Sequence, residues 1–481
     1  MMKRFFYIFL VSLLTLWSVQ AQEANSMCDL GFAFQISGNR SWGFGEPVIT
    51  DVTPNSPAER AGLRVNDVIV AVNGRNTHLQ EPQMMWSWFF ENPTMVRLAI
   101  RNLQHTRREI DIYKHCRYTN AISETQLAPL FAFYSLEDVQ NRQFMLSLST
   151  FSNEQAVFHN YRTFAFAAAE PDDDLILNAR INHLFTRELT QMGLTYDPID
   201  PDFIIRTFFS YQPNPLFDSN SETIGSYRPV WRLDTRTNRM VRIPVFDPAE
   251  VVRISDIPFH LEFGYQFFDR RFFEPGQNAL MWEGRVSERL SAHFPLVDYL
   301  EFHLPLMLKK FPNPGNRTFT TYHVRTIRHN YTGISFDIDD LRTVVSVSPN
   351  SPAAMAGILP GDVIFSIQGQ RFNHRNAHAL TTGYRRFIAE TMHLRDPGTR
   401  FTDAYGFSNA MFWDAARYAD VARAIRNHRR YRAVFAYLFN FNPFIDRYTP
   451  RTIDIEVQRD RERISFNVMP RILLSSQIVV N

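Results

Sequence analysis

Lysine is nearly absent from this chain of 481 residues, where it occurs only at Lys3, Lys114, Lys309 and Lys310. None of these lysines stands in an S-x-x-K pattern, which argues against a Ser–Lys protease. Arginine supplies nearly all the positive charge, and the formal net charge is only +2. The chain as a whole therefore gives no electrostatic argument for binding nucleic acid.

Sequence patterns that carry common enzyme chemistry are also missing. The chain has no G-x-S-G-G or G-x-S-x-G nucleophile, no H-E-x-x-H, no C-x-x-C pair and no glycine loop for phosphate. Its 14 histidines are scattered. We expect no enzymatic activity, no cofactor and no metal site, although a site assembled from residues far apart in the sequence stays open.

Long apolar runs are missing beyond the first residues. Lys3 and Arg4 precede an apolar run from Phe5 to Trp17, and the sequence before Ala21 fits cleavage of a signal peptide after that residue. This run is too short to span a bilayer comfortably. A lipoprotein would need a cysteine directly after the run, and Cys28 lies too far downstream. We predict an exported, periplasmic protein.

Against these absences stands an internal repeat, because residues 54–74 and 349–369 align without a gap. In each copy a serine N-cap and a proline open a short helix, a glycine ends it in the left-handed conformation, and an apolar strand and a turn follow. These positions are Ser56, Pro57, Gly62, 67–69 and 73–74 in one copy, and Ser351, Pro352, Gly357, 362–364 and 368–369 in the other. Before the strand, Gly361 and Asn66 both suit a positive φ.

This unit resembles the core of bacterial PDZ domains, which bind a peptide C-terminus as an extra strand. The resemblance implies a loop and strand that take the terminal carboxylate, a helix at Pro82–Asn92 beside them, and pockets that include Met84 and Met85. The loop-and-strand residues are Leu30, Gly31, Phe32, Ala33 and Phe34 in the first copy, and Thr332, Gly333, Ile334, Ser335 and Phe336 in the second.

Charge distinguishes the two copies. Arg328 lies four residues before Thr332, where it could assist carboxylate binding, whereas Asp29 beside the first loop would repel a carboxylate. We therefore predict that the second domain is the better C-terminus binder, unless an insertion covers its groove. In the alternative, the aromatic and aliphatic loop residues are core, the grooves are empty or self-filled, and the domains act as spacers or assembly interfaces.

The chain has two cysteines, Cys28 and Cys116, which bracket the first PDZ-like copy. A PDZ fold brings its two ends together, so the resemblance implies a disulfide that staples this domain in an oxidising compartment. By the loop-entropy estimate such a bridge contributes about 4 kcal/mol, less any strain. Two free thiols are the alternative.

The segment between the repeats has an α+β pattern, with one sheet covered by helices. It resembles a domain family of unknown function from envelope proteins of Gram-negative bacteria, through Tyr161–Ala167 and the helix after it, Asp200–Phe209 and Met281–Val286. This resemblance implies fold and location but no activity. A second helix is expected within His293–Lys310, where Pro305 should kink or split it.

The second copy contains an insertion rich in arginine and aromatic residues, at about 376–446, before closing strands at Thr452–Gln458 and Ile464–Met469. Within it, Ala415–Phe439 is expected to be a helix. Such a long segment inside a compact domain is usually functional. It would be either a helical extension that packs on its own domain or on the middle one, or a partner surface or a lid over the groove.

We therefore predict an α+β, multidomain chain, in which two PDZ-like β-barrel or sandwich domains with short helices flank a central α+β domain. The expected function is peptide or protein binding as an envelope adaptor or scaffold, for C-termini or exposed strands of envelope proteins. A regulatory or inactive relative of a PDZ protease is the alternative. The expected boundaries are 1–21 for the signal peptide, 22–117 and 321–473 for the PDZ domains, 118–320 for the central domain, and 474–481 for a tail.

Overall fold

The structure is a computed structural model, and it describes the chain in segments from Ser26 to Val480. These segments are residues 26–53, 56–118, 121–131, 142–171, 174–221, 230–237, 239–272, 279–313, 319–371, 389–397, 434–439 and 450–480, with residues 382, 386, 411, 413, 414, 417 and 420. The predicted signal peptide and most of the 376–446 insertion lie outside the described residues.

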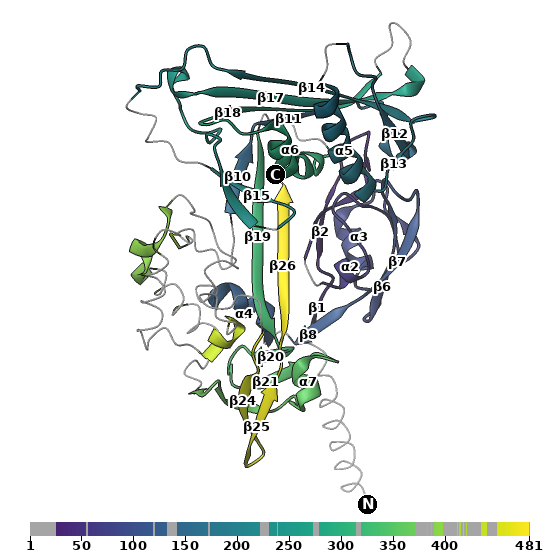
Figure 1. Cartoon of the computed structure of the whole chain (residues 1–481). Coiled ribbons are helices and arrows are strands. Elements are labelled where there is room, and N and C mark those ends of the chain that lie inside the picture. Colours follow the sequence, from purple (N-terminus) through teal and green to yellow (C-terminus); the bar gives the residue numbers. More distant parts are fainter. Residues whose placement is uncertain are drawn as a thin grey trace, which may run out of the picture.

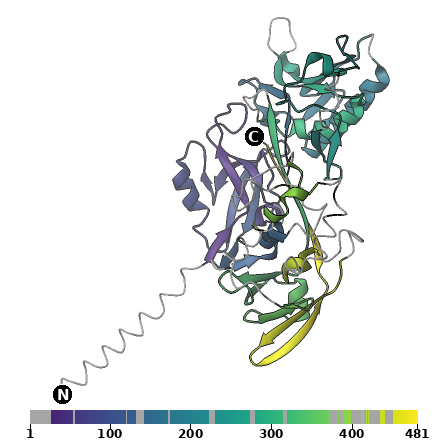
Figure 2. The ribbon, with the colours of Figure 1, turned by 90° about the vertical axis from the view of Figure 1, so that its left-hand side faces the viewer.

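Three bodies are arranged around a long two-stranded ribbon (Figure 1). The central domain lies at one end of the ribbon, the second PDZ-like domain lies at the other end, and the first PDZ-like domain lies beside it. The view turned by 90° shows the same order (Figure 2). The described part of the chain is therefore multidomain and mostly β, with few helices.

The first PDZ-like domain is an open sheet with two helices, α2 (Pro57–Arg60) and α3 (Pro82–Trp88). Its strands, in spatial order, are β2 (Phe32–Ile36), β3 (Pro47–Val52), β4 (Val68–Val72), β6 (Met95–Arg101) and β7 (Arg108–Tyr113), and β5 (Arg75–Asn76) pairs with β4. Local sequence explains the start of α2, because the side chain of Ser56 caps it by accepting from the Glu59 N–H at 3.2 Å. Gly62 then follows with a φ of 82°.

The second PDZ-like domain has two small sheets around α7 (Pro352–Ala356). One sheet has the order β21 (Val344–Val347), β20 (Ile334–Asp337) and β9 (Ala121–Ser123), and the other has the order β23 (Gln370–Arg371), β22 (Val363–Ile367), β24 (Ile453–Arg459) and β25 (Glu462–Val468). Ser351 caps α7 as Ser56 caps α2, and Gly357 ends α7 with a φ of 94°. Among the described residues neither PDZ-like domain closes into a barrel, so the barrel alternative was wrong, and open sheets replace it.

The central domain is a six-stranded sheet with α5 (Leu175–Gln191) and α6 (Leu296–Leu308) against one face. Its strands, in spatial order, are β11 (Leu148–Ser152), β18 (Leu280–Leu290), β17 (Phe259–Asp269), β14 (Phe203–Pro213), β12 (Thr163–Phe166) and β13 (Thr195–Tyr196). The helix predicted after Tyr161–Ala167 is α5, which Asp174 caps by accepting from Ile176 and Leu177. Pro305 lies inside α6 without splitting it. The opposite face of the sheet carries polar pairs such as Arg285–Glu262 at 3.0 Å.

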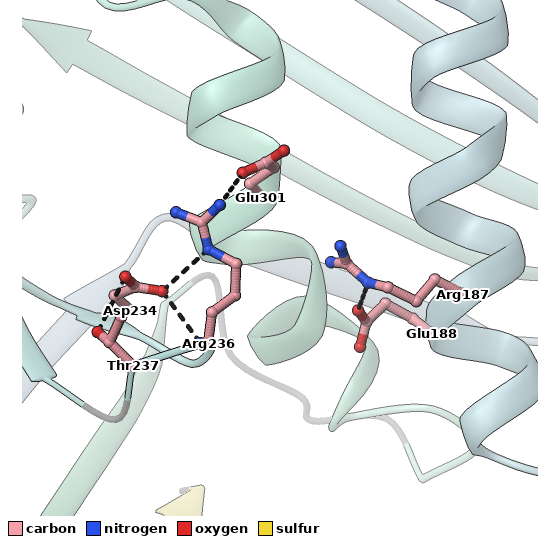
Figure 3. Close-up of polar contacts among 6 residues, drawn as sticks. All are labelled: Arg187, Glu188, Asp234, Arg236, Thr237 and Glu301. Carbon is pink, nitrogen blue, oxygen red and sulfur yellow. Dashed lines mark hydrogen bonds and ion pairs between the residues drawn. The ribbon is translucent and has the colours of Figure 1, made fainter.

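A hairpin of β15 (Val230–Asp234) and β16 (Arg239–Ile243) is attached to α6 through its turn. Arg236 donates to Asp234 at 3.3 Å and forms an ion pair with Glu301 on α6 (Figure 3). Thr237 also donates to Asp234, at 3.0 Å. These contacts fix the turn of the hairpin against α6.

The first PDZ-like domain packs directly on the central domain. Trp42 and Leu103 belong to the same hydrophobic cluster as the core of the central sheet. Asn66, which has the expected positive φ of 72°, also donates its side-chain amide to the carbonyls of Lys309 and Phe311, both at 3.2 Å. This second role distinguishes Asn66 from Gly361, which has a φ of 92° in the other copy.

The ribbon consists of β19 (Thr320–Tyr331) and β26 (Arg471–Val480), paired antiparallel from Tyr322↔Val480 to Tyr331↔Arg471. The short strand β10 (Arg142–Leu146) pairs with the other edge of β19. The predicted tail at 474–481 was therefore wrong, because residues up to Val480 form an edge strand. Its apolar positions escaped the sequence analysis because their partner lies far away in the sequence.

Candidate peptide-binding sites

The first candidate site is the edge strand β2 with helix α3 beside it. In the described part of the chain, β2 pairs only with β3, so its other edge is open to an added strand. Phe34 on β2 contacts Trp86 and Phe89 near α3, with ring centroids 6.0 and 5.7 Å apart. Phe34 and Trp86 therefore belong to an apolar surface along the open edge, and Phe89 lies buried behind it.

Several apolar side chains of this surface are exposed to solvent. Trp86 is 53% exposed, Met84 is 47% exposed and Phe90 is 40% exposed, all within one short stretch of α3 and its end. Exposed aromatic residues that gather beside an open strand are typical of a binding surface. We call Phe34, Ile36, Met84, Trp86 and Phe90 the β2–α3 surface.

The second candidate site is already occupied by the chain itself. Strand β9 pairs antiparallel with β20, through Ser335↔Ser123, Phe336↔Ile122 and Asp337↔Ala121. Because the two strands are antiparallel, the residue that follows β9 lies beside the loop that precedes β20. That residue is Glu124, where α4 (Glu124–Phe131) begins.

The carboxylate of Glu124 lies on the predicted carboxylate loop. One oxygen accepts from the backbone N–H groups of Thr332 at 2.7 Å and Gly333 at 2.9 Å. The other oxygen accepts from the hydroxyls of Thr332 at 2.6 Å and Tyr437 at 2.5 Å. Each oxygen therefore has two donors, and Glu124 is 1% exposed.

Electrostatics at this carboxylate come from neutral donors. Burial raises the pKa of Glu124, and the hydrogen bonds from Thr332, Tyr437 and Gly333 act in the opposite direction. Desolvation also raises the pKa of Tyr437 well above its usual value, which keeps its hydroxyl a donor. In the described structure, Arg328 is not among the four donors that hold Glu124.

The predicted site residues fall into three groups. In the first copy Phe32 and Phe34 are half-buried, Ala33 is exposed, and Leu30 and Gly31 are buried in the loop. In the second copy Thr332, Gly333, Ile334 and Phe336 are buried, and Ser335 lies between β9 and β21. Met84 is on the surface, but Met85 is fully buried in the core of the first domain, since adjacent helix residues face different sides.

Cys28 is disulfide-bonded, and the register of β1 (Ser26–Asp29) with β8 (His115–Tyr118) places the backbone of Cys116 opposite it. These are the two cysteines of the sequence.

The described parts of the insertion pack on the second domain, where Phe435, Leu438 and Trp413 join its core. Of the predicted helix 415–439, the described end Val434–Phe439 is a 3-10 helix, and the rest lies almost wholly outside the described residues.

Sequence reasoning missed Glu124 and the role of Tyr437. Glu124 lies over two hundred residues from the loop that holds it. Tyr437 lies in the insertion and donates its hydroxyl to the same carboxylate. No local pattern marks either residue, because their roles depend on the packing of three separate segments. A glutamate directly after a short strand-forming stretch was the only signal.

No helix among the described residues is long and apolar enough to cross a membrane. The same residues contain no group of three or more His, Cys, Asp or Glu side chains arranged to hold a metal ion.

The two strand-edge sites and the repeated capped helix define a tandem PDZ architecture. The family model described as PDZ domain matches residues 48–84 and 343–380, and the domain of unknown function (DUF4136) matches residues 149–313. A crystal structure of a PDZ domain protein from Parabacteroides distasonis is 33% identical, with a TM-score of 0.78 over 95% of this chain and 99% of that one. The chain belongs to the family of that PDZ domain protein.

Two further solved structures match shorter parts of the chain. The HtrA3 PDZ domain bound to a phage-derived ligand (FGRWV) is 21% identical over 19% of this chain and 88% of that one, with a TM-score of 0.17. A photosystem II D1 C-terminal processing protease is 16% identical over 38% of this chain and 41% of that one, also with a TM-score of 0.17. No curated protein matches.

Proposed function

We propose that the protein is an exported, non-enzymatic binding protein that holds extended peptide segments of envelope proteins on its first PDZ domain. One observation carries this proposal, which is the difference between the two domains. The edge of β2 is open in the described structure and is bordered by exposed apolar side chains, whereas the matching edge of β20 is covered by β9.

The chemistry of the β2–α3 surface defines the expected ligand. Backbone groups on the open edge of β2 pair with an extended chain of any sequence, and this pairing supplies affinity. Specificity then comes from Phe34, Trp86 and Met84 on the surface, because their apolar side chains favour aromatic and aliphatic residues in the ligand. The ligand is therefore an apolar C-terminus or an exposed apolar strand.

The test is the affinity of the full chain for a peptide selected from a displayed library. Trp86→Ala removes a large exposed ring from the surface and should weaken binding by about tenfold or more, as expected for a central aromatic contact. Tyr113→Ala is the matched control, because Tyr113 is 70% exposed and lies on β7 at the far edge of the same sheet.

Titration by fluorescence anisotropy distinguishes the outcomes. Binding by Trp86→Ala that equals the wild type, or an equal loss in Tyr113→Ala, would refute the placement. The export part of the proposal has its own measurement, since the chain recovered from the cell envelope should begin at Gln22. Recovery of the chain from inside the cell, with its first 21 residues still attached, would contradict the proposed export.

A further inference from the structure

We propose that the second PDZ domain has an internal ligand, in which strand β9 and the carboxylate of Glu124 take the place of a bound peptide and its terminal carboxylate. This inference does not rest on the function proposed for the first domain. It assigns the loop at Thr332–Gly333 as a site for the carboxylate of an extended peptide, occupied by the chain itself.

Strand β9 lies where the strand of a bound peptide would lie. Residues 121–123 add to the outer edge of β20, on the side opposite β21, so they extend the sheet as a bound peptide would. Ile122 is 7% exposed and joins the hydrophobic cluster of the second domain with Ile334 and Phe336. The segment therefore supplies both backbone pairing and an anchoring side chain.

The Glu124 carboxylate lies where a peptide's terminal carboxylate would bind. Backbone N–H groups at Thr332 and Gly333 point to one oxygen of Glu124, and Gly333 has a φ of 94°, a conformation that favours glycine. A Cβ at this glycine would lie 2.3 Å from the Cβ of Ser351, so no larger residue fits there. Two adjacent backbone donors with this conformation form a nest for an anion, which is how peptide carboxylates are captured.

Tyr437, from the insertion, closes the site around this carboxylate. Tyr437 is 2% exposed and donates its hydroxyl to Glu124, while Asn330 donates its amide to the backbone carbonyl of Tyr437 at 2.8 Å. The insertion thus covers the carboxylate of Glu124. A carboxylate buried this completely is stable only because all its donors are in place.

The internal ligand belongs to the segment between β8 and β10, which connects two other parts of the molecule. It follows β8, whose backbone lies opposite the Cys28 strand of the first domain, and it precedes β10 of the central ribbon. While β9 is bound to the second domain, the segment between β8 and β10 therefore connects the end of the first domain to the second domain and to the central ribbon. Another peptide would have to displace both β9 and the Glu124 carboxylate to bind there.

Chemical rescue of the full-length protein tests this assignment. Glu124→Ala removes the Cγ and the carboxylate group, which together have the size of an acetate ion. The space that remains is lined by hydrogen-bond donors that favour an anion. Thermal unfolding would be followed in sodium acetate and in sodium chloride of equal ionic strength and pH. The matched control is Glu124→Gln, whose amide fills the same space, so acetate has no room to bind.

We expect Glu124→Ala to lower the Tm by about 5 °C or more, and acetate to restore part of the loss with a saturable dependence on concentration. The wild type and Glu124→Gln should show no such recovery. An unchanged Tm in Glu124→Ala, or an equal acetate effect on all three proteins, would overturn the proposal.

A second variant keeps the test decisive if Glu124→Ala does not fold. Tyr437→Phe removes one donor and keeps the buried ring, so it should lower the Tm by less than Glu124→Ala. Its effect should shrink in the double variant with Glu124→Gln, because the two groups share one hydrogen bond. Strictly additive effects would contradict a shared carboxylate site.

Discussion

His329 is a buried ionisable residue on the ribbon, and its surroundings oppose a positive charge. Its side chain is 0% exposed, and neither ring nitrogen has a hydrogen-bond partner among the described residues. Burial lowers the pKa of His329 from 6.5 to about 4. Strand β19 therefore holds a neutral imidazole in a buried position, and protonation of His329 at low pH favours the unfolded chain.

The sign of the pH effect follows from linkage. Between pH 6.5 and 4 the unfolded chain binds a proton at His329 and the folded chain does not, so stability is full above pH 6.5 and falls as the pH drops to about 4. The loss over this window is on the order of 3 kcal/mol. In His329→Phe, the free energy of unfolding should depend on pH correspondingly less.

Urea titrations at pH 7.5 and pH 4.5 would measure this difference. His78→Phe is the control, because His78 lies at an exposed position in the first domain. An equal pH dependence in His329→Phe and the wild type would show that the ring takes up its proton without opening the structure.

Residue-level inference worked where a position depends on its own neighbours in the sequence. The caps at Ser56 and Ser351 and the positive φ at Gly361 follow from rules of local conformation. Asn66 was predicted for its φ alone, and its contacts with Lys309 and Phe311 could not be foreseen. Met85 was predicted to line the pocket together with Met84, and the structure buries it in the core of the first domain, because a helix this short does not show its buried face in the sequence.

At the scale of elements, β19 is shared by two hydrophobic cores. Tyr322 and Val324 at one end belong to the central core, while Ile327 packs against the core of the second PDZ domain. Its partner β26 follows the same division, with Ile478 and Ile472 at the two ends. The ribbon therefore couples the two domains through continuous backbone pairing.

A proline in the middle of β26 tests this coupling. Leu474 is 44% exposed and pairs in register with Arg328, so its side chain contributes little to either core. Leu474→Pro should destabilise the protein by about 3 kcal/mol, because proline fixes φ at about −65° and bends the strand. Leu474→Ser does not fix φ and should cost much less.

Hydrogen exchange of the folded protein would locate the effect. We expect faster exchange in both α6 of the central domain and β20 of the second PDZ domain, and little change in the first domain. Faster exchange confined to one end of the ribbon would contradict coupling.

At the scale of the whole molecule, the first PDZ domain has its own staple. Cys28 is disulfide-bonded and lies opposite Cys116 in the register of β1 and β8. Replacing both cysteines with serine should remove up to about 4 kcal/mol from this domain by the loop-entropy estimate. The β2–α3 surface should then lose peptide binding at a lower temperature than in the wild type.

Melting curves followed by Trp fluorescence and by peptide binding would measure this change, with the reduced wild type as the matched comparison. The acetate response of Glu124→Ala should persist in the serine background, since that site lies in another domain. Loss of both properties together would show that the staple supports the whole molecule.

The overall plan could be predicted from the repeat, but the relations between domains could not. Two copies of a capped helix and strand placed the PDZ domains correctly, and Tyr161–Ala167 with Met281–Val286 placed strands of the central sheet. Glu124 on Gly333 and β26 on β19 are contacts between distant segments, which leave no periodicity in either segment. Physical rules of local conformation carry no information about such pairs.

The position of β26 also sets an order of events in time. Residues Tyr322 to Tyr331 of β19 pair with a strand that is synthesised well over a hundred residues later. Until that strand emerges, β19 has one unpaired edge, and such edges recruit other chains. If the chain is exported as proposed, it crosses a membrane unfolded and from one end, and the interval between β19 and β26 is then a window in which a chaperone must protect this edge.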